Sequence, residues 1–136
     1  MIKSQTKIKV RYAETDQMAY VHHSHYALYL EEARMDLLRI MGIDCGQMER
    51  DGIIMPVVEM RTRYSSPLRF GDTITVEVEI EPPWDTKLEF RYKIFNQDQK
   101  LVSRSWTTLV FAEKESGKLV MDTHQYFESF ITYKQS

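Results

Sequence analysis

An aspartate and three histidines lie within a short polar segment near the start of the chain, RYAETDQMAYVHHSHY, which covers residues 11–26. The aspartate is Asp16, and the histidines are His22, His23 and His25. An ionised carboxylate attacks a carbonyl directly or removes a proton from water as a general base. A histidine beside it can orient the carboxylate or the reacting group. We therefore interpret this segment as a candidate active site.

Two other interpretations of these side chains stay open. An aspartate between a strand and a helix is most often a turn or capping residue without a chemical role. Asp16 and the three histidines could also ligate a metal ion. However, adjacent histidines lack the i, i+4 spacing that places two ligands on one helix face. We therefore expect no metal site, and the sequence indicates no other cofactor.

The polar segment leads into a long helix. Apolar residues recur there at three- and four-residue intervals and form one stripe, which consists of Tyr26, Tyr29, Leu30, Ala33, Leu37, Ile40 and Met41. Other apolar residues lie off the stripe, so we expect a largely enclosed helix. Ser24 is the predicted N-cap, and Gly42 suits the left-handed position that ends a helix. The unpaired N-terminal amides and partial positive charge of such a helix would polarise a carbonyl held near Asp16.

The rest of the chain reads mostly as extended strands joined by short turns. A short strand is predicted before the polar segment, at residues 7–12, with Ile8, Val10 and Tyr12 on one face. Period-two alternation or turn residues predict four later strands, at residues 53–66, 72–80, 87–96 and 101–112. Short helical segments are expected at 44–51 and 123–130. One helix packed on an antiparallel sheet is an α+β arrangement.

Length and composition set further limits. The 136 residues suit one domain spanning 1–136, and the net charge of -2 gives no reason to expect nucleic-acid binding. No segment is apolar enough for membrane insertion, and Cys45 is the single cysteine, so we expect a reducing, cytoplasmic compartment. A single helix–sheet layer leaves a sheet face and the sheet edges uncovered, so we also expect a homo-oligomer, either a dimer or, preferably, a tetramer.

Two stretches of the chain resemble a known family. RYAETDQMAYVHHSHYALYLEEAR and RYSSPLRFGDTITVEVEI are similar to the hotdog-fold acyl-CoA thioesterases of the 4-hydroxybenzoyl-CoA thioesterase family. The positions that match the family pattern are Asp16, Val21, His23, Glu31, Ala33 and Arg34. Three positions depart from it, because Ala19, His22 and His25 stand where glycine, an aromatic residue and asparagine are usual.

The resemblance implies a hotdog fold, in which a long antiparallel sheet wraps around one central helix. It also implies hydrolysis of an acyl-CoA by Asp16, acting as nucleophile or general base, with the amide of His23 or a neighbour binding the thioester oxygen. Val21, His22 and Tyr26 are then expected to contact the substrate, in a pocket between two protomers. By charge alone, the candidate contacts for the CoA phosphates are Arg61, Arg63 and Arg69.

Two competing functions remain at this point. A hotdog-fold hydratase or dehydratase would use an Asp–His pair on an acyl-CoA or acyl-carrier protein, in a different local pattern. A non-catalytic acyl-binding protein would bind the acyl-CoA without releasing its thiol. The thioesterase is preferred because the order of acid, loop and helix matches it.

Overall fold

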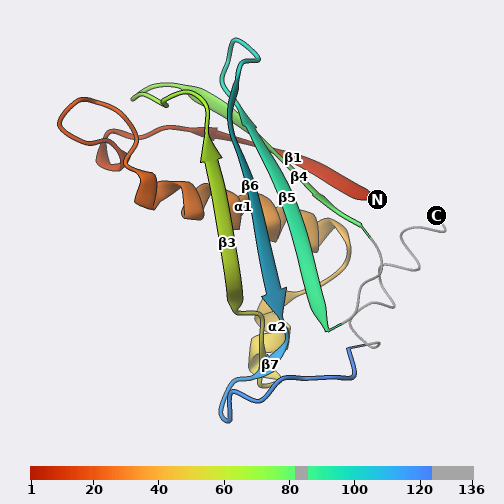
Figure 1. Ribbon diagram of the computed structural model, residues 1–136. Coiled ribbons are helices and arrows are strands. Elements are labelled where there is room, and N and C mark those ends of the chain that lie inside the picture. The colour runs from red at the N-terminus through yellow and green to blue at the C-terminus, as the bar shows by residue number, and fades with distance from the viewer. Residues whose placement is uncertain (82–85, 124–136) are drawn as a thin grey trace.

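A computed structural model describes residues 1–81 and 86–123 of the chain. One long helix, α1, lies across one face of a five-stranded sheet, and a short helix, α2, follows it (Figure 1). The helices are α1 (Tyr26–Ile40) and α2 (Cys45–Arg50), with 3-10 turns η1 (Tyr12–Glu14) and η2 (His23–His25). The strands are β1 (Ile2–Lys9), β2 (Ile53–Ile54), β3 (Val57–Tyr64), β4 (Thr73–Ile80), β5 (Lys87–Phe95), β6 (Leu101–Val110) and β7 (Ala112–Glu113).

The sheet is antiparallel throughout, with the strand order β1-β4-β5-β6-β3. Strands β4, β5 and β6 are consecutive in the chain and pair as antiparallel neighbours, as predicted. Strand β3 precedes them in the chain but pairs with β6 at the far edge, so β1 and β3 form the two edges (Figure 1). The predicted α+β arrangement, with one central helix on one antiparallel sheet, is therefore confirmed.

The core lies between α1 and the sheet, and the predicted alternation places its residues. The buried side chains of the two central hairpin strands are Ile74, Val76, Val78, Ile80, Leu88, Phe90, Tyr92 and Ile94. From α1, the predicted stripe is buried from Tyr26 to Leu37, whereas Ile40 is 46% exposed. Each fully buried apolar side chain contributes about 1.5–3 kcal/mol. This packing fixes α1 along the sheet and therefore fixes the position of its N-terminus.

The sequence predicted the C-terminal end of α1 correctly but not its N-cap. Gly42 has φ 85°, and its amide donates to the carbonyl of Arg39 at 3.0 Å, while the amide of Ile43 donates to Leu38 at 2.9 Å. These paired bonds end the helix as predicted. Ser24, by contrast, is not the N-cap. The N-cap position of α1 is His25, whose side chain makes no capping hydrogen bond. Because η2 runs directly into α1, the side-chain cap lies earlier, at His22 before η2, whose Nδ1 accepts the amide of Ser24 at 3.2 Å.

Two strand predictions need correction. The first strand runs from Ile2 to Lys9 rather than over residues 7–12, because it pairs along its whole length with β4. Tyr12 lies in η1 and is 74% exposed, so it does not share a buried face with Val10. The extended segment 53–66 is divided near Pro56: β2 pairs with β7, and β3 pairs with β6.

The short helix expected at 44–51 is present as α2. The helix expected at 123–130 lies, apart from its first residue, outside the described residues. Among the helices that are described, none is both long and apolar enough to cross a membrane.

Candidate active site

Asp16 lies in a tight turn that it stabilises itself. Its Oδ1 accepts the amides of Met18 at 2.8 Å and Tyr20 at 3.2 Å, and its own amide donates to the Tyr20 carbonyl at 2.7 Å. The residue is exposed, and Oδ2 has no hydrogen-bond partner within the described part of the chain. One carboxylate oxygen therefore holds the loop, and the other is available to a ligand.

The loop after Asp16 packs against the segment that leads into β4. The amide of Val21 donates to the Leu68 carbonyl at 2.8 Å, and the amide of Phe70 donates to the Ala19 carbonyl at 3.2 Å. The Arg69 guanidinium donates to the hydroxyl of Tyr20 at 3.2 Å and lies over its ring. Arg69 is therefore placed beside the candidate catalytic loop.

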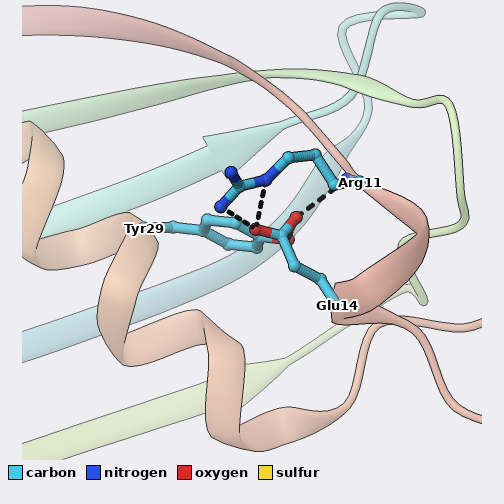
Figure 2. A network of polar contacts seen from close by, with 3 residues as sticks. All are labelled: Arg11, Glu14 and Tyr29. Atoms are coloured by element: carbon cyan, nitrogen blue, oxygen red, sulfur yellow. Dashed lines mark hydrogen bonds and ion pairs between the residues drawn. The ribbon is translucent and has the colours of Figure 1, made fainter.

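A buried acid that the sequence analysis missed lies two residues before Asp16. Glu14 is only 6% exposed, and Figure 2 shows its carboxylate between Arg11 and Tyr29. Its Oε1 accepts the amide of Arg11 and the hydroxyl of Tyr29, both at 2.8 Å, and its Oε2 accepts Nη2 of Arg11 at 3.1 Å. The spacing of Arg11 and Glu14, three residues apart, was a signal for this pair, but the contact with Tyr29 was not readable from sequence.

Burial and hydrogen bonding act in opposite directions on this carboxylate. Burial alone would raise the pKa of Glu14, but the Arg11 amide, the Tyr29 hydroxyl and the Arg11 guanidinium outweigh it and hold that pKa below its ordinary value. Burial, followed by the hydrogen bond to Glu14, raises the pKa of Tyr29. Glu14 is therefore ionised and Tyr29 protonated at neutral pH, as their hydrogen bond requires.

The three histidines lie at the N-terminus of α1. His22 accepts the Ser24 amide, and the rings of His22 and His23 lie 4.2 Å apart, tilted by 33°. Nδ1 of His25 is buried and has no hydrogen-bond partner among the described residues. As the first residue of η2, His23 has no intrahelical acceptor for its own amide. That amide lies where the partial positive charge of the helix is concentrated.

An open pocket of about 380 Å³ lies beside this terminus, lined by Val21, His23, Tyr26, Tyr64, Ser65, Ser66 and Pro67. The rings of Tyr26 and Tyr64 meet edge to face at 4.9 Å. Burial, with a smaller contribution from Tyr64, raises the pKa of Tyr26 to about 12, so its hydroxyl is neutral. The structure thus brings together three of the predicted site residues and adds the end of β3, which the sequence analysis had treated only as a strand and turn.

The remaining predicted residues do not line this pocket in a single chain. Asp16 and His22 belong to the loop that leads into it. Tyr64 faces α1, so Arg63 and Arg61 face the opposite side of the sheet by strand alternation. There the guanidinium of Arg61 stacks 4.3 Å above the ring of Trp106. Over residues 1–81 and 86–123, no three His, Cys, Asp or Glu side chains are arranged to hold a metal ion.

The loop contains a strained residue that yields a prediction. Ala19, which replaces the usual glycine, has φ 64°, a left-handed conformation that disfavours a side chain by about 1–2 kcal/mol. Gly would relieve this strain but adds unfolded-state entropy of about 0.4–1 kcal/mol. We expect Ala19→Gly to raise the free energy of unfolding by roughly 0.5–1 kcal/mol in urea denaturation. The matched variant Ala13→Gly, in η1 with negative φ, should lower the free energy of unfolding. If both variants changed the free energy of unfolding equally, the prediction would be contradicted.

The Glu14 contacts give stability a defined pH dependence. We expect Glu14→Gln to lower the free energy of unfolding at pH 7 by about 2 kcal/mol, because an ionised acceptor is lost. The pKa of Glu14 is lowered on folding, so its ionisation stabilises the protein above the ordinary value of 4.5. The difference between the two proteins should therefore shrink as pH falls below about 4.5. Thermal unfolding between pH 3 and 8, with the exposed Glu32→Gln as control, measures it; a difference independent of pH would refute it.

Comparison with known proteins agrees with this geometry. The sequence pattern of the thioesterase-like superfamily matches residues 10–125. The putative acyl-CoA thioesterase YneP of Bacillus subtilis is 36% identical over 133 residues, which cover 98% of this chain and 96% of that protein. The acyl-CoA thioester hydrolase YbgC of Escherichia coli is 26% identical over 76% of this chain and 77% of its own length.

Among solved structures, that of DHNA-CoA thioesterase from Staphylococcus aureus superposes with a TM-score of 0.90 at 30% identity, covering 99% of this chain and 90% of the other. The expected hotdog fold is thereby confirmed. The family match spans well over half of the chain, and two relatives that align over nearly all of it are named a putative acyl-CoA thioesterase and a DHNA-CoA thioesterase. The chain therefore belongs to the thioesterase-like superfamily and is a thioester hydrolase of the hotdog fold.

Proposed function

We propose that the protein hydrolyses an acyl-CoA to the free acid and CoA, with Asp16 as the essential carboxylate. One observation carries this proposal: the Asp16 loop runs directly into the N-terminus of α1, beside an open pocket lined by Val21, His23 and Tyr26. The relative that is 36% identical along nearly the whole chain is named a putative acyl-CoA thioesterase, which supports CoA as the thiol part of the substrate.

The proposed mechanism uses the groups at this terminus. Asp16 either removes a proton from water, which adds to the thioester carbon, or attacks that carbon itself to form an anhydride that water then hydrolyses. The carbonyl oxygen gains negative charge in both cases, and the amide of His23 binds it; one such donor is worth about 3 kcal/mol in the transition state. The carbon–sulfur bond breaks when this oxygen regains its double bond, and CoA leaves as a thiolate that takes up a proton. In the anhydride route this step forms the anhydride and precedes its hydrolysis by water. The His23 ring orients water or the thioester.

The pocket and the basic residues suggest how the substrate is held. The acyl group would contact Val21, Tyr26 and Tyr64, and His22 would border it. Arg69 is the first candidate for a CoA phosphate because it lies beside the catalytic loop. Arg61 and Arg63 lie on the opposite sheet face, so phosphate contacts from them require the nucleotide to reach around β3. A reducing cytoplasm suits Cys45, which has no disulfide partner.

We also propose that the working unit is a homodimer or a tetramer built from it, joined through β3. Strand β3 pairs with β6 on one side only, and it exposes Val58 at 57% and Met60 at 52%. The other edge strand, β1, carries Lys3, Lys7 and Lys9, which discourage strand pairing. A second copy aligned antiparallel along β3 would satisfy the unpaired edge, cover these apolar side chains and close the open side of the pocket.

The role of Asp16 is testable by a substitution that spares the loop. Asparagine keeps an oxygen for the amides of Met18 and Tyr20, so Asp16→Asn should fold normally while hydrolysis of acyl-CoA falls by about 10²–10⁴-fold. Thiol release from short, long and aromatic acyl-CoA esters, measured with a chromogenic thiol reagent, gives the rate. Asp98→Asn, at an exposed turn between β5 and β6, is the matched control.

Each alternative function predicts a different result in this experiment. Unchanged turnover by Asp16→Asn would exclude the role of Asp16. Hydration of an enoyl-CoA without thiol release would identify a hydratase. Saturable binding of acyl-CoA without either reaction would identify a binding protein.

The proposed assembly is tested by the mass of the particle in solution. Light scattering on a sizing column should give two or four times the 16.2 kDa mass of the chain. Met60→Lys should shift the mass toward one chain and reduce turnover, because a charge on a pairing edge disfavours strand addition. Leu119→Lys, at a residue 57% exposed and outside the five-stranded sheet, should change neither. A wild-type monomer with full activity would contradict the proposal.

A further inference from the structure

The mechanism above leaves one buried carboxylate without a role. Figure 2 shows Glu14 at the meeting point of three parts of the fold: Arg11 in the segment between β1 and η1, the turn η1 itself, and the helix α1. Its donors are Arg11 from the first part and Tyr29 from the helix. A buried carboxylate is unfavourable unless several donors compensate it, and this one is well compensated.

Glu14 also holds the catalytic loop through its main chain. Its carbonyl accepts the amide of His22 at 3.1 Å, and its amide donates to the Arg11 carbonyl at 3.0 Å. Glu14 precedes Asp16 by two residues, and His22 precedes His23 by one. The residue therefore binds one end of the loop covalently and the other by a hydrogen bond, while its side chain fixes both to α1.

This connection determines where the two reacting groups lie relative to the helix terminus. Asp16 is positioned by its own turn, but that turn is attached to α1 through Glu14 and Tyr29. The helix terminus supplies the amide of His23, so any displacement of Glu14 changes the distance between the attacking oxygen and the oxyanion donor. A displacement of about 1 Å typically reduces the rate about 10²-fold.

We propose that Glu14 is a positioning residue for thioester hydrolysis, acting through its bond to Tyr29 to hold the Asp16 loop against the N-terminus of α1. The inference rests on the proposed role of Asp16. Glu14 lies at one side of the loop, bound to the helix, and takes no proton in the reaction. If Glu14 had only a structural role, its substitution would lower stability alone. If it positions the loop, its substitution lowers kcat by more than the loss of stability explains.

The decisive variant is Tyr29→Phe, which removes only the hydroxyl that donates to Glu14. Its matched control is Tyr92→Phe in β5, because that hydroxyl is also buried, accepts from Nη1 of Arg34 at 3.1 Å and bonds Oγ1 of Thr107 at 2.6 Å. Both variants lose one buried hydroxyl from the core, but only Tyr29 connects to the loop. Glu14→Gln and Glu14→Ala complete the set.

We expect Tyr29→Phe to lower kcat by about tenfold with KM within twofold of wild type, and Glu14→Ala to lower kcat by about 10²-fold. Glu14→Gln should lower kcat less than Tyr29→Phe does, because its amide oxygen can still accept from Tyr29. The double variant Glu14→Ala/Tyr29→Phe should be no slower than Glu14→Ala, since both remove the same contact. Tyr92→Phe should keep the wild-type kcat whatever its loss of stability. Amide hydrogen exchange of residues 15–22 should accelerate in the Glu14 and Tyr29 variants only.

Two results would overturn the inference. One is a wild-type kcat in Tyr29→Phe and Glu14→Ala, and the other is an equal loss of kcat in Tyr92→Phe and Tyr29→Phe. Either result, obtained while Asp16→Asn is inactive, refutes the role of Glu14 and leaves the proposed function standing. Full turnover by Asp16→Asn refutes the proposed function itself, and the role of Glu14 with it.

Discussion

The burial of α1 against the sheet is the constraint on which the rest of the molecule depends. Ala33 and Leu37, in the middle of the helix, are fully buried, and the inner faces of β4 and β5 supply the opposing apolar side chains. A helix held along its length has a fixed axis, so its N-terminal amides occupy a fixed place. The candidate active site is built at that place, where unpaired donors and a partial positive charge already exist. The burial of α1 therefore fixes the position of the amides and the partial positive charge on which the candidate site depends.

Polar interactions then attach the candidate catalytic loop to this terminus. The loop has few apolar side chains to bury, so it is held by hydrogen bonds: Asp16 to its own turn, Val21 to Leu68, and Glu14 to Tyr29. Most of these contacts use backbone groups or charged acceptors, which are directional and relatively strong. The left-handed Ala19 shows that the loop keeps its shape despite local strain. These hydrogen bonds fix the loop while the Asp16 carboxylate stays exposed to solvent.

The two edge strands of the sheet, β1 and β3, differ in how well they suit pairing with a second chain. Strand β1 carries lysines that discourage strand pairing, whereas β3, although it also carries charged residues, exposes Val57, Val58 and Met60. The pocket beside Tyr26 borders the end of this same strand at Tyr64. The proposed association along β3 and the proposed enclosure of the acyl group would both follow from this one exposed strand, which links the proposed assembly to the proposed activity.

The resemblance to a known family, carried by the motif around Asp16 and His23, singled out these two residues. Local periodicity was enough to predict the helix and the buried faces of β4 and β5, and Gly42 marked the end of the helix. These features depend on neighbours a few residues apart, whose spacing the chain displays directly. Only the tertiary structure decided the length of β1, which follows from pairing with β4, and the cap at His22, which follows from how η2 joins α1. It also decided the Glu14–Tyr29 contact, between residues 15 apart, and the placement of Tyr64 at the pocket. Such contacts depend on how separate elements pack together, and no periodicity in the sequence records that packing.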